Sequence, residues 1–330
     1  MSDAGLDLVA GGAGFLGSHL VEALLARGHR VRVLDDLSTG REENLAEVGG
    51  HPALELVVGD AADAAVARDA MRGVERVFHL AARPSVPWSV AHPEAAHRAN
   101  HQTTLALLEA ARAEGVSGFV FSSSSAIYGE RPGLPKREDD EPDPRSPYAE
   151  HKLLGERALA EAAAAGGPPA VSLRYFNAYG PRQDPSSPYS GVISIFADRL
   201  AAGVAPTIYG DGLQTRDFVF CSDVVAANLA AAEAAPRLHA AGMQAPVVNV
   251  GTGREVTIVE LWRTMARVAA VEAAAPEFAP PRPGDVRHSR ADVERAADWL
   301  GFRAGTSLEE GLRTTLATLL TPPRDSESAP

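Results

Sequence analysis

Tyr148 and Lys152 lie four residues apart in the segment SPYAEHKLLGE, and a phenol beside an amine can move protons. The chain has 31 lysines and arginines together, yet Lys152 is one of only two lysines, the other being Lys136. With 6 tyrosines, the pattern Tyr-x-x-x-Lys arises by chance about 0.04 times in this length. The pair is therefore a candidate catalytic element.

Residues four apart on a helix share one face, so the two side chains can approach each other. A nearby ammonium stabilises phenolate and lowers a tyrosine pKa from about 10. Tyr148 would then accept or donate a proton near neutral pH. The compact ammonium of Lys152 can also hold a ribose hydroxyl, where a planar guanidinium fits badly. The alternative is an exposed helical pair without chemistry.

A run of four serines, residues 122–125, ends the apolar stretch VSGFVF. Ligands of doubly wound folds bind at the carboxyl ends of the strands. One of these serines is expected to orient a substrate hydroxyl beside Tyr148. The run alone does not say which serine acts.

A glycine-rich loop follows the first strand-like stretch, in LDLVAGGAGFLGSHL. Gly11, Gly14 and Gly17 lie between a strand and a helix, and Gly12 completes G-x-G-x-x-G. Glycines allow a tight turn and a close approach of the backbone to a pyrophosphate at the helix N-terminus. The position of the loop, at the first strand of an alternating pattern, favours dinucleotide binding over an ordinary turn.

Acidic residues follow the next two strands. Asp35 ends RVRVLD, 18 residues after Gly17, and Asp36 is adjacent and could share its role. A carboxylate there can hold the adenosine ribose hydroxyls and repels a 2′-phosphate, which favours NAD over NADP. Asp60, in VVGD, is either an adenine contact or the N-cap of the next helix.

The first half of the chain alternates strand and helix patterns, which predicts a Rossmann-type doubly wound α/β fold with a parallel sheet. Helices are expected over roughly 15–27 and 94–114 and from Ser146 onward. The expected strands are LDLVA, RVRVLD, LELVVGD, VERVFHLAA, VSGFVFSSSS, AVSLRYFN and, much later, PVVNVGTG.

Beyond Asn177 the chain becomes rich in proline and glycine, which indicates a smaller C-terminal α/β substrate-binding domain over the sheet. We assign residues 1–176 and about 217–252 to the NAD-binding domain, and 177–216 and 253–320 to the substrate-binding domain. The tail 321–330 is expected to be disordered.

Composition narrows the function classes. The 330 residues are 45% hydrophobic and 22% charged with a net charge of −12, which argues against nucleic-acid binding. The single cysteine, Cys221, excludes an internal disulfide or a cysteine-cluster metal site, and no metal is predicted. We find no signal peptide and no apolar run able to span a bilayer. The chain is therefore expected to be cytoplasmic and not bound to a membrane.

Eight motifs occur together: GGAGFLGSHL, VLDDLSTG, FHLAA, SSSSAIYG, SPYAEHK, RYFNAYGPRQDP, GDGLQTRDF and RPGDVRHSRAD. With them, roughly residues 6–315 resemble the extended short-chain dehydrogenase/reductase family, in particular its NAD-dependent sugar-nucleotide 4-epimerases. In that pattern the active serine lies four residues before the tyrosine of a Tyr-Gly pair. Here the pair is Tyr128–Gly129, so the resemblance implies a triad of Ser124, Tyr148 and Lys152.

The same resemblance implies the ligand contacts. For NAD it adds Phe15, Leu16, Ala81 and Asn100 to the glycines, acids and helical pair above; Asn100 could instead lie near the triad or on a helix polar face. For a UDP-sugar it implies Asn177 near the sugar and diphosphate, Arg216 and Arg282 on the phosphates, Asp285 on the uridine ribose, Tyr209 beside the base, and Ser85 and Ser124 on the sugar. Each arginine could instead be a solvated charge.

Several reactions fit the family. Related 4,6-dehydratases place an Asp–Glu pair just after the active serine or threonine, where this chain has Ser125 and Ala126. A UDP-glucuronate 4-epimerase would use the same triad but often has threonine at the Asn177 position. A reductase that releases its cofactor would prefer NADP. A non-catalytic NAD-binding scaffold would not need the acid–base pair.

The resemblance also suggests the sugar. Ser289 lies where 4-epimerases restricted to glucose and galactose have a bulky tyrosine, and a small residue leaves room for a 2-acetamido group. We therefore favour UDP-GlcNAc/UDP-GalNAc interconversion, with UDP-Glc/UDP-Gal as further substrates. A homodimer is expected through helices at about 94–114 and 148–164.

Overall fold

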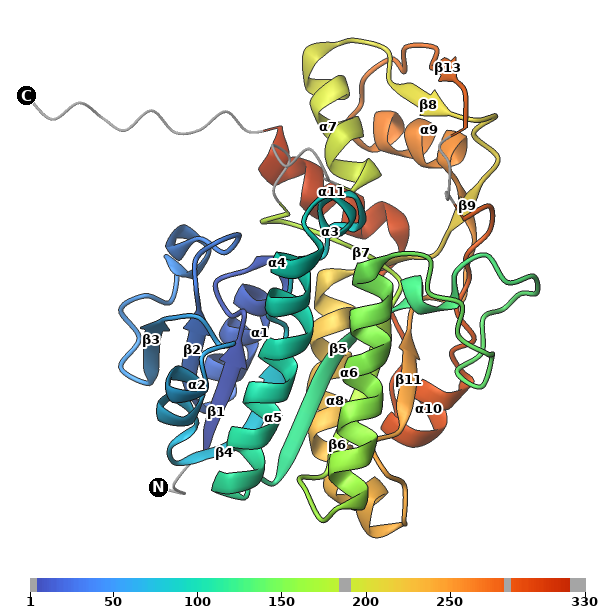
Figure 1. The fold of residues 1–330 in the computed structure, drawn as a ribbon. Coiled ribbons are helices and arrows are strands. Elements are labelled where there is room, and N and C mark those ends of the chain that lie inside the picture. The colour runs from blue at the N-terminus through green and yellow to red at the C-terminus, as the bar shows by residue number, and fades with distance from the viewer. Residues whose placement is uncertain (1–4, 184–190, 282–285, 321–330) are drawn as a thin grey trace, which may run out of the picture.

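Seven parallel strands form one sheet in the order β11-β6-β5-β4-β1-β2-β3 (Figure 1). The computed structural model describes residues 5–183, 191–281 and 286–320. All seven predicted strands are present, and the late PVVNVGTG stretch pairs with β6 as expected. The strands are β1 (Leu6–Ala10), β2 (Arg30–Asp35), β3 (Leu54–Val58), β4 (Val74–His79), β5 (Gly118–Ser124), β6 (Ala170–Tyr175) and β11 (Val247–Val250).

Helices cover both faces of the sheet, and strands such as β1 are therefore buried on both sides. One face packs against α1 (Phe15–Ala26), α8 (Cys221–Ala240) and α10 (Glu294–Leu300). The other packs against α2 (Ala64–Met71), α5 (Thr103–Glu114) and α6 (Pro147–Ala164). This is the predicted doubly wound α/β fold.

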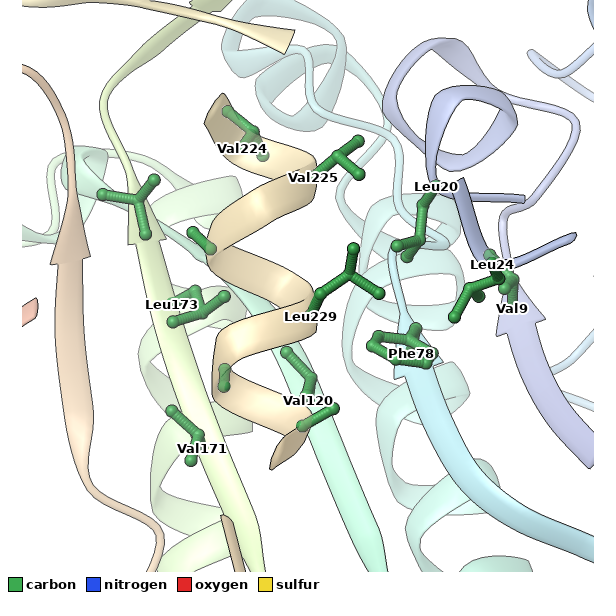
Figure 2. Packing of buried hydrophobic residues seen from close by; sticks show 14 of the residues in the cluster. Val9, Leu20, Leu24, Phe78, Val120, Val171, Leu173, Val224, Val225 and Leu229 are labelled. Carbon is green, nitrogen blue, oxygen red and sulfur yellow. The ribbon is translucent and has the colours of Figure 1, made fainter. Parts of the chain in front are cut away.

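The core of the first face is apolar and fully buried. Figure 2 shows Phe78 and Val120 of the sheet together with Leu20 of α1 and Leu229 of α8, which belong to the same buried cluster. Leu20 and Phe78 are completely shielded from solvent. This packing fixes α1, and with it the glycine loop, against the sheet.

The helix predicted over 94–114 is interrupted. It consists of α4 (Pro93–His97), a π-helical turn η2 (Arg98–Gln102) and α5, and the short α3 (Val86–Ala91) precedes it. A π turn inserts one extra residue per turn and often marks a functional position. Here the turn contains the buried Asn100.

Helix α6 begins where its sequence predicts. The Ser146 hydroxyl accepts a hydrogen bond from the Ala149 amide at 3.2 Å, and Pro147 occupies the first turn. Gly155 lies against the ring of Phe121 on β5, where a Cβ atom would come within 2.5 Å of the ring. The missing side chain therefore lets α6 approach β5 closely.

A second group of elements lies at the carboxyl edge of the sheet (Figure 1). Its core includes Phe196 and Trp262, whose rings are 5.2 Å apart. The helical elements here and in the connecting loops are α7 (Val192–Ala202), α9 (Ile258–Val268), α11 (Leu308–Leu319), η1 (Glu42–Leu45) and η3 (Ser125–Tyr128). The short strands are β7 (Asn177–Tyr179), β8 (Thr207–Tyr209), β9 (Thr215–Arg216), β10 (Phe218–Phe220), β12 (Val256–Thr257) and β13 (Glu277–Ala279).

No helix in the described part of the chain is long and apolar enough to cross a membrane. The predicted tail, 321–330, lies outside the described residues.

Candidate active site

The glycine loop forms a cradle that a larger residue would fill. Gly11 has φ +81°, and a Cβ there would lie 2.6 Å from the Ala81 amide nitrogen. A Cβ on Gly17 would lie 2.0 Å from the Gly11 carbonyl oxygen. Because α1 begins at Phe15, its free amides point at this cradle, as a pyrophosphate requires. The residues present therefore fit a dinucleotide.

The predicted ribose carboxylate is in place at the end of β2. Asp35 is 7% exposed, and its two oxygens accept hydrogen bonds from the Ala13 and Leu37 amides, both at 3.0 Å. Burial raises the pKa of Asp35, and these hydrogen bonds oppose the rise. Asp36 is exposed and accepts from the amide and hydroxyl of Ser38. Asp35 is thus the more firmly positioned of the two.

A pocket brings the predicted cofactor residues together. Its lining includes Gly11, Gly14, Asp35, Asp36, Asp60 and Ala81. Asp60 accepts the Ala62 amide at 2.8 Å and pairs with Arg98 at 2.6 Å. The N-cap of α2 is Asp63, so the alternative assignment of Asp60 as an N-cap is wrong. Asp60 instead faces the pocket with Arg98.

Three further residues predicted to contact the cofactor, Phe15, Leu16 and Asn100, do not line this pocket. Phe15 and Leu16, in the first turn of α1, pack partly buried against the hydrophobic core. Asn100 does not line the pocket but accepts the Arg83 amide at 2.7 Å. It therefore fixes the backbone after Ala81, which does line the pocket.

Ser124, Tyr148 and Lys152 converge further along the same sheet edge. Ser124 is the last residue of β5, and its hydroxyl interacts with the Tyr148 phenol and opposes the rise of the phenol pKa. The Lys152 ammonium donates to the Ser122 carbonyl at 2.7 Å and lies 5.9 Å from the centre of the Tyr148 ring. The structure thus brings the predicted triad together from β5 and α6.

The pKa shift of Tyr148 differs in direction from the one expected from the sequence. Burial raises the pKa of Tyr148, and the hydrogen bond with Ser124 offsets only part of the rise. Burial also lowers the pKa of Lys152 to about 7, while the Glu156 carboxylate opposes the fall. The direction for Tyr148 is therefore opposite to the expected lowering, because desolvation of the phenol outweighs the interaction with Ser124.

Three predicted substrate residues, Asn177, Arg216 and Ser289, lie at or beside residues 215–217. The Asn177 amide donates to the Asp217 carbonyl at 2.9 Å, and the Ser289 amide donates to the Thr215 carbonyl at 3.2 Å. Arg216 lies between these anchors on β9. Tyr209 is 36% exposed on β8, with its carbonyl bonded to Gln214.

Two predicted substrate residues, Arg282 and Asp285, lie outside the described residues. Ser85 caps α3 by accepting the Trp88 amide at 3.1 Å. On the same helix, the Ser89 hydroxyl accepts the Tyr148 amide at 3.2 Å. Helix α3 therefore brings Ser85 close to the start of α6.

Sequence reasoning missed the buried polar residues that hold the site. Asp217 is fully buried and accepts the amides of Thr252, Gly253 and Ala291. Asn249, also fully buried, accepts the Tyr128 hydroxyl at 2.6 Å. Their signal in the sequence was only a polar residue inside an apolar stretch.

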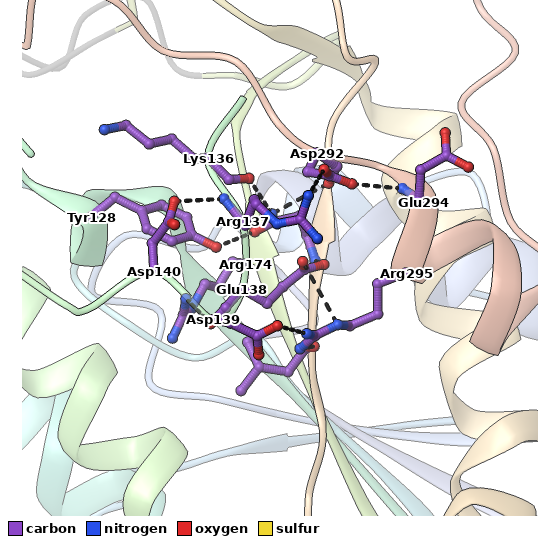
Figure 3. Close-up of polar contacts among 12 residues, drawn as sticks. Tyr128, Lys136, Arg137, Glu138, Asp139, Asp140, Arg174, Asp292, Glu294 and Arg295 are labelled. Atoms are coloured by element: carbon purple, nitrogen blue, oxygen red, sulfur yellow. Dashed lines mark hydrogen bonds and ion pairs between the residues drawn. The ribbon is translucent and has the colours of Figure 1, made fainter. Parts of the chain in front are cut away.

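Figure 3 shows the polar contacts beside Tyr128. Arg174 lies over the Tyr128 ring at 4.8 Å and donates to the Glu138 carbonyl. Glu138 in turn pairs with Arg295 at 3.7 Å. These contacts join β6, the loop around Glu138 and the segment that follows Ser289. Within the described residues, no group of three or more His, Cys, Asp or Glu side chains is arranged to hold a metal ion.

The fold and the glycine cradle together define the class: a dinucleotide-binding protein of the doubly wound α/β type. Residues 8–251 match the model of the NAD dependent epimerase/dehydratase family. A UDP-glucose 4-epimerase of Mycolicibacterium smegmatis is 43% identical over 311 residues, which cover 94% of this chain and 96% of that protein.

Solved structures agree with this match. The UDP-N-acetylglucosamine 4-epimerase of Methanobrevibacter ruminantium, in complex with UDP-N-acetylmuramic acid, has a TM-score of 0.89 at 37% identity, covering 97% of this chain and 99% of that one. The Thermus thermophilus UDP-glucose 4-epimerase in complex with NAD has a TM-score of 0.82 at 38% identity, covering 95% and 98%. The chain belongs to the NAD-dependent epimerase/dehydratase family, and NAD is its cofactor.

Proposed function

We infer that the chain is an NAD-dependent 4-epimerase of UDP-sugars, with UDP-GlcNAc and UDP-GalNAc as its main pair and UDP-Glc and UDP-Gal as further substrates. The observation that carries this proposal is the convergence of Ser124, Tyr148 and Lys152 beside the glycine cradle. The relatives above, which include a UDP-glucose and a UDP-N-acetylglucosamine 4-epimerase, support it.

The residues suggest a division of labour. Ser124 orients the sugar 4-hydroxyl, and Tyr148 takes its proton. When bound, NAD would supply the redox chemistry, as the acceptor and then the donor of the C4 hydride. The 4-keto sugar rotates in the pocket so that its other face is presented. Tyr148 then returns the proton to the 4-oxygen, and the configuration at C4 is inverted. Lys152 holds the nicotinamide ribose and stabilises the phenolate.

The structure supports epimerisation over dehydration. The 4,6-dehydratases need acids just after the active serine, and here η3 begins with Ser125 and Ala126. Neither side chain can protonate a leaving hydroxyl as a carboxylic acid does. A UDP-glucuronate 4-epimerase is the alternative that keeps the same triad.

The remaining assignments complete the proposal. Residues 1–176 and about 217–252 bind NAD, whereas 177–216 and 253–320 bind the UDP-sugar. Arg216 and Arg282 neutralise the diphosphate, and Asn177, Ser85, Tyr209 and Asp285 contact the rest of the ligand. Two copies pair in the cytoplasm through residues about 94–114, which include α5, and about 148–164 of α6; Leu105 of α5 is 42% exposed. Light scattering on the purified protein tests the dimer.

Product analysis without added NAD tests the activity. UDP-GlcNAc, UDP-GalNAc, UDP-Glc, UDP-Gal and UDP-GlcA are incubated in parallel, and the products are separated by chromatography or identified by NMR. We expect the N-acetyl pair to interconvert, and Tyr148→Phe to abolish this because it removes only the phenol oxygen. Turnover of UDP-GlcA alone would overturn the substrate assignment, and no turnover of any sugar would leave the scaffold alternative.

Ser289→Tyr tests the sugar preference. The added ring should fill the space for the 2-acetamido group, so turnover of UDP-GlcNAc should fall by at least about tenfold relative to UDP-Glc, about 1.4 kcal/mol of discrimination. Unchanged GlcNAc turnover would refute the role of Ser289.

A further inference from the structure

A buried ion pair lies directly behind the catalytic lysine. Glu156 is one helical turn after Lys152 on α6 and is 5% exposed. Arg174 of β6 donates two hydrogen bonds to its carboxylate, at 2.9 and 2.7 Å, and the Ser123 hydroxyl donates a third at 2.5 Å. This bidentate geometry fixes the carboxylate. The proposed mechanism gives the pair no role.

The contacts between α6 and β5 have a regular pattern. Tyr148, Lys152 and Glu156 are each four residues apart and lie along one helix face. They contact Ser124, the Ser122 carbonyl and the Ser123 hydroxyl, respectively. Glu156 is therefore the third member of a row whose first two members do the chemistry.

The surroundings of Lys152 make its charge sensitive to Glu156. The Lys152 ammonium is buried and lies 4.9 Å from the centre of the Phe121 ring. It donates a hydrogen bond to the Ser122 carbonyl. Burial lowers the pKa of Lys152, and Glu156 is the carboxylate that opposes this. In a site with little water, one charge changes a neighbour's pKa by one or more units.

The other titratable groups around Lys152 are held neutral. His79 of β4 hydrogen-bonds Thr104, and burial together with the charge of Lys152 lowers its pKa well below the usual value. Tyr175 of β6 bonds Ser122 and Asn228, and burial raises its pKa to about 12. Burial also raises the pKa of Tyr148. The Glu156–Arg174 pair thus holds the fixed charges nearest to Lys152 on α6 and β6.

We propose that Glu156 and Arg174 are positioning residues that set the charge of Lys152. The Glu156 carboxylate holds the proton on the lysine, and Arg174 limits how strongly it does so. Lys152 then stays near the balance between its two protonation states, and can stabilise the Tyr148 phenolate as the proton moves. This role rests on the proposed function, because Lys152 acts there.

The proposal makes predictions of opposite sign for the two partners. Glu156→Gln leaves the Arg174 charge without its partner, so the pKa of Lys152 should fall by about one unit or more. Arg174→Gln keeps a hydrogen-bond donor but removes the positive charge, so the same pKa should rise by a similar amount. The double variant is again neutral and should titrate close to the wild type. A purely structural pair would not shift the pKa in opposite directions.

The lysine content of the chain allows a direct measurement. Protein labelled with ¹³C at the lysine ε-carbon gives signals from Lys136 and Lys152 only, and Lys136→Arg assigns them. The Lys152 chemical shift is followed against pH in each variant. Asp7→Asn is the matched control, since it neutralises another buried carboxylate, one held by two hydrogen bonds from Arg76 and outside the Glu156–Arg174 pair. It should leave the Lys152 titration unchanged.

The measurement needs no sugar substrate, so it separates the two hypotheses. Opposite shifts, together with parallel shifts of the alkaline limb of epimerase activity, support the proposal. Equal pKa values, or shifts of the same sign, in the two single variants overturn it, whatever sugar is turned over. If Glu156→Gln does not fold, Arg174→Gln and the double variant still differ only in the Glu156 charge. The pKa must then be about one unit higher in Arg174→Gln.

Discussion

Gly155→Ala tests the argument that a close approach of α6 to β5 builds the active site. The added Cβ would lie 2.5, 2.8 and 3.4 Å from three ring carbons of Phe121. Carbon atoms in contact stay about 3.5–4.0 Å apart, so the overlap is about 1 Å. Phe121 is completely buried and its ring cannot swing into solvent. Either the helix or the ring must therefore move.

Two free energies compete in this variant. Overpacking a buried site costs about 1–3 kcal/mol. Alanine improves helix propensity by at most about 1 kcal/mol over glycine. We therefore expect the free energy of unfolding to fall by about 1 kcal/mol. Because Tyr148 and Lys152 would move away from Ser124 and Ser122, turnover should fall by about 10- to 100-fold.

Urea unfolding and turnover of the best UDP-sugar are measured together. Gly305→Ala is the control, since its Cβ would have no heavy atom within 4 Å. This variant should keep the wild-type free energy of unfolding and the wild-type turnover. Phe121→Leu makes room for the methyl group, so the Gly155→Ala/Phe121→Leu double variant should be more stable than the two single losses predict. Wild-type stability and turnover in Gly155→Ala would refute the close-approach argument.

Two further predictions concern Lys152. Lys152→Arg should lower turnover by at least about 100-fold and weaken NAD binding, because the guanidinium cannot fit beside Ser122 and Phe121. The amount of NAD that stays bound through gel filtration tests the second effect. Lys136→Arg is the control and should behave as the wild type. Burial lowers the folded-state pKa of Lys152 to about 7, so between pH 7 and 9.5 the unfolded chain binds more protons and stability rises with pH. Lys152→Met should therefore have a higher free energy of unfolding than the wild type at pH 7, and this difference should shrink toward pH 9.5. Urea unfolding at several pH values measures it. A difference that stays constant would show that Lys152 titrates normally.

The strand pattern was predictable because each parallel strand is a short apolar run that ends in a motif. Asp35 and Ser124 end β2 and β5, and Asp60 closely follows β3. The carboxyl ends of parallel strands meet at one edge, so local signals were enough to place these residues together. The spacing of Tyr148 and Lys152 likewise needed only helix geometry.

Features that depend on distant contacts were not predictable. The π turn around Asn100 has no local signal, since it is stabilised by the bond between the Asn100 side chain and the Arg83 amide. The pKa of Tyr148 depends on burial, which the sequence does not give. In the sequence Glu156 has the pattern of an ordinary helix charge, and only the fold brings Arg174 of β6 beside it.

The segment that contains Ser289 is held by backbone atoms, and this decides what its substitution can show. The amide of Ser289 bonds the Thr215 carbonyl, and the amide of Ala291 bonds the Asp217 carboxylate at 3.1 Å. The Asp292 amide donates to the Lys136 carbonyl at 2.9 Å. These bonds do not involve the Ser289 side chain, so Ser289→Tyr adds side-chain volume while the segment keeps its anchors. A change in sugar preference in that variant would therefore report on space beside the sugar, and not on a displaced segment.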